Sequence, residues 1–388
     1  CWYRFLGWAL VAALVWTPVL VVTVALLGDA IVEPLMRASR VGWLLLPAFA
    51  AVLFVGLRVL PKLGTRAGRA GLKARVAKLW RWEFWPAWVF YLPLVPVYAW
   101  LALRYRGLTV WTAANPGIPA GGVVGESKAD ILSRLPPEWI VPTLLIPSGE
   151  TGARAQSALA AVAARGWAYP LILKPDAGQR GAGVKKCRDA VEVKKYLLAN
   201  PDPVIAQPYH PGPFEVGIFY YRVPGEAKGR IFSITDKVFP VLVGDGKSTL
   251  GELIWAHPRF RMQAATFLNR HASEAARVPA DGEWFPLALA GNHCQGTLFR
   301  DGARLITTEL ERAVNAIAKS FDGFFIGRFD VRYSSEKEFR QGRGFAVIEL
   351  NGATSESTNL YDPSWPLWRA YRTLFAQWAI LFRIGRAN

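Results

Sequence analysis

The spacing of hydrophobic residues divides the chain into an apolar N-terminal part and a longer part with mixed periodicity. Residues 5–27 carry no charge and form an apolar run long enough to cross a bilayer as a helix. Residues 43–60 form a second, shorter apolar run. We therefore expect two transmembrane helices, 5–27 and 43–60, within a membrane region that covers residues 1–107.

A third apolar stretch, residues 84–103, differs from the first two because it contains three prolines, Pro86, Pro93 and Pro96. A proline lacks a backbone N–H and interrupts helical hydrogen bonding. The stretch is also rich in Trp and Tyr, which gather at the headgroup layer of a membrane. We expect it to enter the membrane and return, or to lie at the interface, rather than to cross.

Beyond a connector at 108–123, which is rich in Gly, Pro and Ala, the pattern changes to short strand-like runs separated by helical periods. Residues 124–362 are therefore predicted to form one domain of the α+β class. Strands are expected at 143–147, 171–175, 203–208, 215–223 and 345–350, and helices at 151–165, 189–199 and 307–320.

Residues 363–388 carry aromatic side chains at three- and four-residue steps with arginines between them, which predicts an amphipathic helix. We favour an interfacial helix whose aromatic face lies against a bilayer. Ordinary packing on its own domain is the alternative. The aromatic residues are Trp365, Trp368, Tyr371, Phe375, Trp378 and Phe382.

Composition agrees with this division. Hydrophobic residues make up 52% of the 388 residues and charged residues 19%, which excludes a disordered chain. Lys and Arg outnumber Asp and Glu by 46 to 29, and the excess flanks the apolar runs. This arrangement points to a membrane surface rather than to nucleic acid. Three irregularly spaced cysteines give neither a disulfide framework nor a metal motif. Since the chain begins with Cys1 rather than Met, we expect an N-terminal piece to be missing.

The basic residues are densest at 61–82, a segment with no acidic residue. By the positive-inside rule this segment is a cytoplasmic loop. It is either a topology signal alone or a basic amphipathic helix that binds acidic headgroups, with Leu72, Val76, Leu79 and Trp80 on its apolar face.

The first candidate for chemistry is Lys174, at the end of the predicted strand 171–175. It is followed by a flexible loop with Gly178, Gly181 and Gly183. A lysine supplies a point charge, and glycines let backbone N–H groups approach phosphate oxygens. The combination indicates a polyphosphate site.

The second candidate lies far downstream, where Arg328 and Asp330 are two residues apart, as are Glu349 and Asn351. Residues two apart in a strand share one face. Carboxylates and an amide suit Mg²⁺, and the arginine can stabilise developing negative charge. A structural salt bridge in a sheet is the alternative, but burying two carboxylates without a partner is costly, so we favour a metal site.

Taken together, Lys-Pro with its glycine loop, a strand ending near Glu215, Arg-x-Asp and Glu-x-Asn resemble the ATP-grasp superfamily. The likeness covers about 124–362 and is greatest to carboxylate–amine ligases, such as D-alanine–D-alanine ligase and cyanophycin synthetase. The resemblance implies an ATP-grasp fold, in which two α/β subdomains grip ATP, with ATP and Mg²⁺ as cofactors.

The resemblance also implies roles for single residues. Lys128 and Lys174 would contact phosphates under the loop of Gly178, Gly181 and Gly183, and Asp330, Glu349 and Asn351 would bind magnesium. Arg328 would stabilise the transition state. The remaining nucleotide contacts would come from Gln207, Tyr209 and His210 at the adenine hinge, Glu215 at the ribose and Lys237 at the γ-phosphate.

On the acceptor side the resemblance points to Asn292, His293 and Arg300, and to Ser355 and Glu356 in the loop after the last strand. Glu356 departs from a plain carboxylate-binding pattern, so we expect it to hold a substrate ammonium. The alternative for each of these residues is a solvated loop.

The function expected from the resemblance is a membrane-bound ligase that forms an amide through an acyl phosphate. Its partners would be a small-molecule or lipid-linked carboxylate and amine, with no nucleic acid. The expected location is a bacterial-type inner membrane with the catalytic domain facing the cytoplasm, where ATP is found. A kinase or phosphotransferase, and a non-catalytic nucleotide-binding membrane subunit, are the alternatives.

Overall fold

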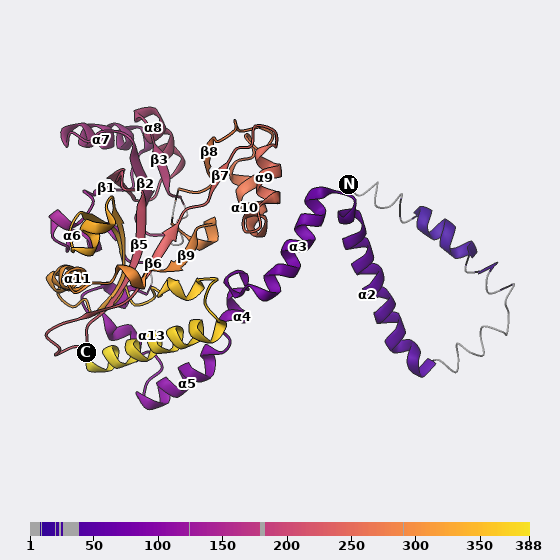
Figure 1. The fold of residues 1–388 in the computed structure, drawn as a ribbon, viewed down its shortest axis with the longest axis horizontal. Helices are drawn as coiled ribbons and strands as arrows, with labels where there is room; N and C mark the ends of the chain where they lie inside the picture. The colour runs from indigo at the N-terminus through magenta and orange to yellow at the C-terminus, as the bar shows by residue number, and fades with distance from the viewer. Residues whose placement is uncertain are drawn as a thin grey trace. The chain divides into compact units, whose positions relative to one another are not determined.

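The computed structural model describes residues 8, 10–19, 21–22, 25, 39–123, 125–178, 183–289 and 291–388. The chain divides into two compact units, Cys1–Leu72 and Lys73–Asn388 (Figure 1). Residues 73–123 belong to the second unit together with the α+β fold. The boundary between the two units thus falls after residue 72, whereas the sequence analysis places a boundary after residue 107.

The first unit contains helix α2 (Ser39–Leu63), which covers the apolar run at 43–60 and exposes Phe49 and Leu57. Among the residues that the structure describes, no helix has both the length and the apolar character that crossing a membrane requires. Residues 43–60 thus form a helix, as predicted, but this helix does not meet the requirements of a membrane span. Most of the other predicted span, 5–27, lies outside the described residues.

Helix α3 (Arg66–Trp80) occupies most of the predicted basic loop at 61–82, so this segment is mainly helical. Its side chains Val76, Leu79 and Trp80 are exposed. The helix presents apolar and basic side chains to solvent, and whether it binds acidic headgroups stays a prediction.

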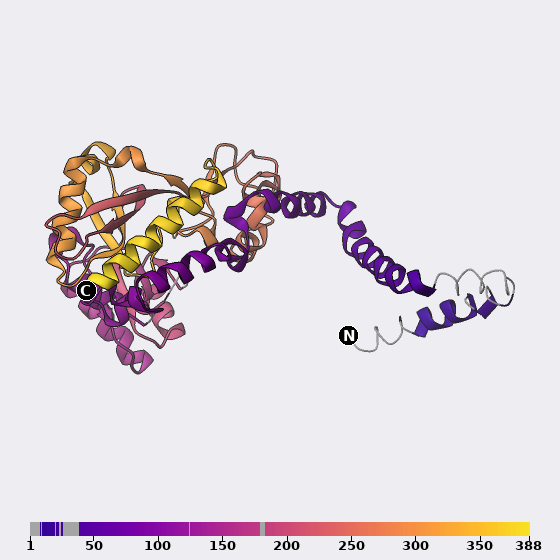
Figure 2. The same ribbon diagram turned by 90° about the horizontal axis from the view of Figure 1, so that it is seen from below.

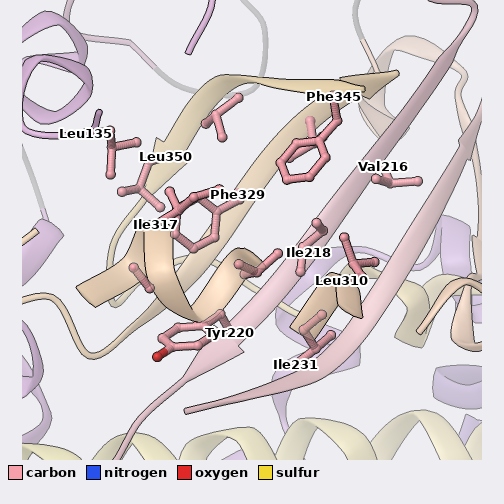
Figure 3. Packing of buried hydrophobic residues seen from close by; sticks show 14 of the residues in the cluster. Leu135, Val216, Ile218, Tyr220, Ile231, Leu310, Ile317, Phe329, Phe345 and Leu350 are labelled. Carbon is pink, nitrogen blue, oxygen red and sulfur yellow. The ribbon is translucent and has the colours of Figure 1, made fainter. Parts of the chain in front are cut away.

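The larger sheet of the second unit has five antiparallel strands in the order β11-β10-β5-β6-β9. Alternate residues of β10 point to opposite faces, so Phe329 and Val331 enter the core while Arg328 and Asp330 lie on the other face. Helix α11 (Thr308–Ser320) packs on the core face (Figure 3). The strands are β5 (Phe214–Tyr221), β6 (Arg230–Val238), β9 (Leu298–Asp301), β10 (Ile326–Tyr333) and β11 (Phe345–Asn351).

A second antiparallel sheet has four strands in the order β1-β4-β2-β3. Helices α7 (Thr151–Ala164) and α8 (Ala190–Ala199) pack on it around Leu171 and Leu173. Its strands are β1 (Leu144–Ile146), β2 (Leu171–Pro175), β3 (Lys185–Cys187) and β4 (Val204–Pro208). The predicted strands and helices of this region are confirmed, and so is the α+β class with two sheets.

An insertion between β6 and β9 has its own small core around Phe267 and Leu287, which the sequence did not predict. It contains a two-stranded sheet and short helices: β7 (Val241–Val243), α9 (Leu250–Ala256), η5 (Phe260–Gln263), α10 (Ala264–Arg270), β8 (Trp284–Pro286) and η6 (His293–Gln295).

The stretch predicted to be re-entrant or interfacial, 84–103, packs within the second unit. Its helices α4 (Ala87–Tyr91) and α5 (Leu94–Arg104) follow the short η1 (Trp82–Phe84). Phe90 and Leu101 are buried among side chains of helix α13 (Leu367–Ala387), which runs alongside α5 (Figure 2). Pro93 caps the start of α5, a position where a proline removes no helical hydrogen bond.

Helix α13 confirms the predicted C-terminal helix but not the orientation of its aromatic face. Phe382 is fully buried, and Trp378 packs against Tyr98 and Trp111. The alternative of packing on its own domain therefore explains the aromatic spacing. Trp368 differs, because its side chain is exposed.

The predicted connector at 108–123 is folded onto the larger sheet rather than free. The amide of Asn115 is buried, donates to the carbonyl of Ile326 and accepts from the N–H groups of Phe325 and Ile326. The remaining short elements are η2 (Val110–Ala114), η3 (Pro119–Gly122), α6 (Lys128–Ser133), η4 (Pro137–Trp139), η7 (Ala303–Leu305), α12 (Glu336–Arg340) and η8 (Thr358–Tyr361).

Candidate active site

A cavity of about 1280 Å³ lies in the second unit, lined by residues of both sheets. Pockets for single small ligands usually measure roughly 300–1,000 Å³. The cavity therefore has room for a nucleotide and a second reactant. Strands β2 and β4 supply one wall, β5, β10 and β11 another, and residues of η1, α4 and α5 a third.

Two lysines line the cavity, Lys174 from the smaller sheet and Lys128 from helix α6, which packs on the larger sheet. Lys174, at the end of β2, is buried, and its Nζ donates to the carbonyl of Ile348 over 2.9 Å. A β-bulge leaves Ile348 outside the β10–β11 register. Lys128 begins α6 and donates to the carbonyls of Gly178 and Asp176.

The charge of Lys174 is poorly compensated. Among the described residues no carboxylate lies within 4.0 Å of its Nζ, whereas Nζ of Lys128 is 4.0 Å from Oε1 of Glu349. Burial lowers the pKa of Lys174, although the charges of Glu349 and other carboxylates oppose the shift. A buried ammonium of this kind is suited to an anion entering the cavity.

The structure places the predicted glycine loop only in part. Gly178 lines the cavity. Gly183 has a φ of +73° and accepts a hydrogen bond from the hydroxyl of Tyr196, but it does not belong to the lining residues. Gly181 lies outside the described residues.

Asp330, on β10, contacts two cationic side chains in the cavity. Its Oδ1 lies 2.9 Å from Nε of Arg328 and 3.1 Å from Nζ of Lys237. Burial alone would raise the pKa of Asp330, but the charges of Arg328 and Lys237 outweigh burial and lower it to about 2. Asp330 is therefore ionised at neutral pH.

The three predicted magnesium ligands lie together. Asp330 stands opposite Glu349 in the β10–β11 pair, and Nδ2 of Asn351 is 3.4 Å from Oδ2 of Asp330. Among the described residues no cluster of three His, Cys, Asp or Glu side chains forms a metal site. The set of two carboxylates and one amide supplies oxygen donors, which fit Mg²⁺.

Glu215 and Lys237 form a buried pair on the floor of the cavity. Oε1 of Glu215 is 2.9 Å from Nζ of Lys237, and Oε2 is 3.1 Å from Nε of Arg332. Both oxygens of Glu215 are thus bound to cations, which leaves them less available to a ribose. Sequence reasoning missed Arg332, which continues the alternation of Arg328 and Asp330 along β10.

The predicted adenine hinge lines the cavity at the end of β4. The side chain of Gln207 turns away and donates to the hydroxyl of Thr143, whereas the ring of Tyr209 lies 3.6 Å from Nζ of Lys186. Nδ1 of His210 accepts from the N–H of Gly212. Lys186 was missed because its strand, β3, is only three residues long.

Glu356 lines the cavity from the loop that follows β11, five residues after Asn351. Both of its carboxylate oxygens lie within 2.9 Å of the hydroxyl of Tyr91, and the hydroxyl of Tyr361 lies 3.2 Å from Oε2. Nη1 of Arg328 donates to the backbone carbonyl of Glu356. Tyr91 comes from α4, 265 positions away, and no sequence pattern indicated its contact with Glu356.

His293 joins a second cluster in the same wall. Its Nε2 lies 3.3 Å from Oε2 of Glu83, which also accepts from Nη1 of Arg259 over 2.7 Å. Burial opposes ionisation of Glu83, but these two partners outweigh it and lower its pKa. Asn292 lines the cavity beside His293, and its Oδ1 accepts from the N–H of Cys294.

Two other predicted substrate residues have different outcomes. Ser355 lines the cavity, but its hydroxyl donates to the carbonyl of Gly352. Arg300 is exposed and does not line the cavity, because Phe299, its neighbour in β9, occupies the inward position. The structure thus places Arg300 outside the lining of the cavity, and its contact with substrate stays a prediction.

Comparisons with known proteins add a limited result. No family model and no curated protein matches the chain. A bifunctional glutathione synthetase from Pasteurella multocida matches with 17% identity and a TM-score of 0.31, over 64% of this chain and 36% of that one. The chain thus spans little more than a third of that enzyme's length.

Two further solved structures match. D-cycloserine synthetase DcsG has 15% identity and a TM-score of 0.36, over 75% of this chain and 81% of that one. D-alanine–D-alanine ligase from Bacillus anthracis has 11% identity and a TM-score of 0.36, over 67% and 66%. With TM-scores of 0.31 to 0.36, these matches do not support a conclusion about function. The proposed function depends on the residues of the cavity.

Proposed function

We propose that this chain is an ATP-dependent carboxylate–amine ligase of the ATP-grasp type. The observation that carries the proposal is that lysines and oxygen donors of opposite charge line one cavity. Lys174 and Lys128 line the cavity together with the oxygen donors Asp330, Glu349 and Asn351, and Nζ of Lys128 is 4.0 Å from Oε1 of Glu349. A nucleotide triphosphate with its divalent cation has the complementary charges.

In the proposed reaction, a carboxylate oxygen of the substrate attacks the γ-phosphorus of ATP, and ADP leaves. The nitrogen of the amine then attacks the carbonyl carbon of the acyl phosphate, loses a proton, and phosphate leaves as the amide forms. Lys174 and Lys128 would hold the phosphates, and Arg328 would neutralise charge developing on the carbonyl oxygen. Mg²⁺, held by Asp330, Glu349 and Asn351, would supply further charge neutralisation.

The test is magnesium-dependent ATP turnover of the full chain with mixed amino acids and amines, followed by product analysis. We expect ADP, phosphate and an amide, and loss of turnover in Glu349→Gln. Glu226→Gln, an exposed residue away from the cavity, is the control. A stable phosphorylated product would identify a kinase instead, and nucleotide binding without turnover would identify a non-catalytic nucleotide-binding subunit.

The same proposal includes attachment to a membrane, with the catalytic unit on the cytoplasmic side of a bacterial-type inner membrane and an amphiphilic or lipid-linked substrate. In its support, the outer surface of α4 and α5 exposes Trp88, Leu92 and Leu103, each by 60% or more. Residues 84–125 contain no acid, and Arg104 and Arg106 adjoin this apolar surface. Apolar and basic side chains together suit an anionic bilayer.

Vesicle flotation tests the attachment. We expect the full chain to float with phosphatidylglycerol vesicles more than with phosphatidylcholine vesicles, and Trp88→Ser combined with Leu103→Ser to reduce flotation. The control is Trp284→Ser, because Trp284 is as exposed as Trp88 but lies in the insertion. Equal flotation of the variants and the wild type would reject this surface.

A further inference from the structure

The carboxylate of Glu356 differs from the other acidic groups of the cavity wall in its partners. It contacts the hydroxyls of Tyr91 and Tyr361, which supply one proton each, while a carboxylate offers about four acceptor positions. Among the described residues no Lys, Arg or His nitrogen lies within 4.0 Å of its oxygens. The charge of Arg328 favours the ionised carboxylate from a distance, but no cationic nitrogen of the described residues contacts it, so part of its hydrogen-bonding capacity is left for a ligand.

Neighbouring carboxylates show the contrast. Asp330 is bound by Arg328 and Lys237, and Glu83 is bound by Arg259. These pairs lower the pKa of both acids, whereas burial raises the pKa of Glu356. A negative charge at Glu356 therefore lacks the compensation that its neighbours have, and a cation bound beside it would supply that compensation.

The surroundings of Glu356 are mainly aromatic. The faces of aromatic rings attract cations, and the rings also provide apolar area for an attached group. The ring of His293 stacks on Tyr361 at a centroid distance of 5.6 Å, which closes this wall. The other aromatic residues lining the cavity near this segment are Trp82, Trp85, Phe90, Phe299 and Trp378.

We propose that Glu356, Tyr91 and Tyr361 form the subsite for the ammonium group of the amine substrate, and that this amine is carried on an apolar group. This inference rests on the proposed ligase function, because that reaction defines the amine substrate. The subsite adjoins the reacting centre, because Nη1 of Arg328 lies 3.2 Å from the backbone carbonyl of Glu356. It also gives helix α4, which precedes the α+β fold in sequence, a direct part in substrate recognition.

Isothermal titration of the full chain with 2-phenylethylammonium tests the subsite, with the neutral 2-phenylethanol as the matched probe. In the presence of ADP and Mg²⁺ we expect the wild type to bind the ammonium at least tenfold more tightly than the alcohol. Glu356→Gln should abolish this preference while MgADP affinity stays unchanged, and Glu356→Asp should keep part of it. Glu226→Gln, which lies away from the cavity, should behave as the wild type.

Equal binding of the two probes by the wild type would overturn the inference, and this result does not depend on whether any variant folds. Full retention of the ammonium preference in Glu356→Gln would overturn it as well. Failure of MgADP to bind would instead reject the proposed ligase function. The ammonium preference, measured without nucleotide, would in that case still decide the subsite.

Discussion

Nη1 of Arg259 lies 2.7 Å from Oε2 of Glu83, although 176 positions separate the two residues in sequence. The side chain of Glu83 is 2% exposed and that of Arg259 12%. Glu83 precedes helix α4, and Arg259 belongs to the insertion between β6 and β9. The pair therefore connects η1, which lines the cavity, to the insertion, although the two segments are distant along the chain.

Replacing Glu83 by glutamine should destabilise the second unit. Removing one partner of a buried ion pair leaves the other charge uncompensated, at a cost of about 3–5 kcal/mol. Urea unfolding of the full chain measures this loss. The control Glu226→Gln removes an exposed pair with Arg383 and should change stability by less than about 1 kcal/mol. Equal stability of the two variants would contradict the role given to the buried pair.

Lys174→Met should separate binding from stability. We expect MgATP affinity to fall at least about tenfold, or about 1.4 kcal/mol. Stability without nucleotide should be unchanged or higher, because burial disfavours the ammonium, as its lowered pKa indicates. Equilibrium binding measures the MgATP affinity, and urea unfolding of the same preparation measures the free energy of unfolding. The exposed Lys247→Met is the control, and wild-type affinity in Lys174→Met would rule out a phosphate contact.

Asp330→Asn should show a pH-dependent loss of stability. The pKa of Asp330 falls from an ordinary value of 3.8 to about 2 in the folded state. Its ionisation therefore contributes about 2 kcal/mol above pH 4, and this contribution disappears as the pH falls towards 2. The difference between wild type and variant in urea unfolding should be largest at pH 7 and small near pH 2. A difference independent of pH would show that the charge is not responsible.

Phe299 and Arg300 provide a matched pair on opposite faces of β9. Phe299→Ala removes a buried ring from the cavity wall, so we expect a loss of about 3 kcal/mol in stability and weaker binding of 2-phenylethylammonium. Arg300→Ala should change neither property by more than about 0.5 kcal/mol, because its side chain is exposed. Loss of probe affinity in Arg300→Ala would restore the residue to the site.

The strand residues that line the cavity could in large part be predicted from short-range sequence patterns. Strand alternation placed Arg328 and Asp330 on the face opposite Phe329, and the apolar run before Lys174 placed that lysine at a strand end. The same alternation placed Glu349 and Asn351 on one side of β11. These inferences depend on residues within one strand, where backbone geometry fixes the direction of each side chain.

Hydrophobicity alone did not identify what the stretch 84–103 and the aromatic face of α13 pack against. Apolar side chains leave water equally well for a bilayer or for a neighbouring helix, since the hydrophobic effect has no direction. In the structure the two segments bury Phe90, Leu101 and Phe382 against each other. The sequence identified both as apolar helical segments, but it did not specify their partners.

The sequence by itself determined which residues share a face of β10 and of β11, and that Lys174 stands near the end of a strand. Only the tertiary structure decided that Tyr91 meets Glu356, that Glu83 meets Arg259 and that Arg300 faces solvent. The physical reason is that side-chain direction within a strand is a local property of the backbone. Contacts between distant segments depend instead on how whole elements pack, and no local pattern encodes that choice.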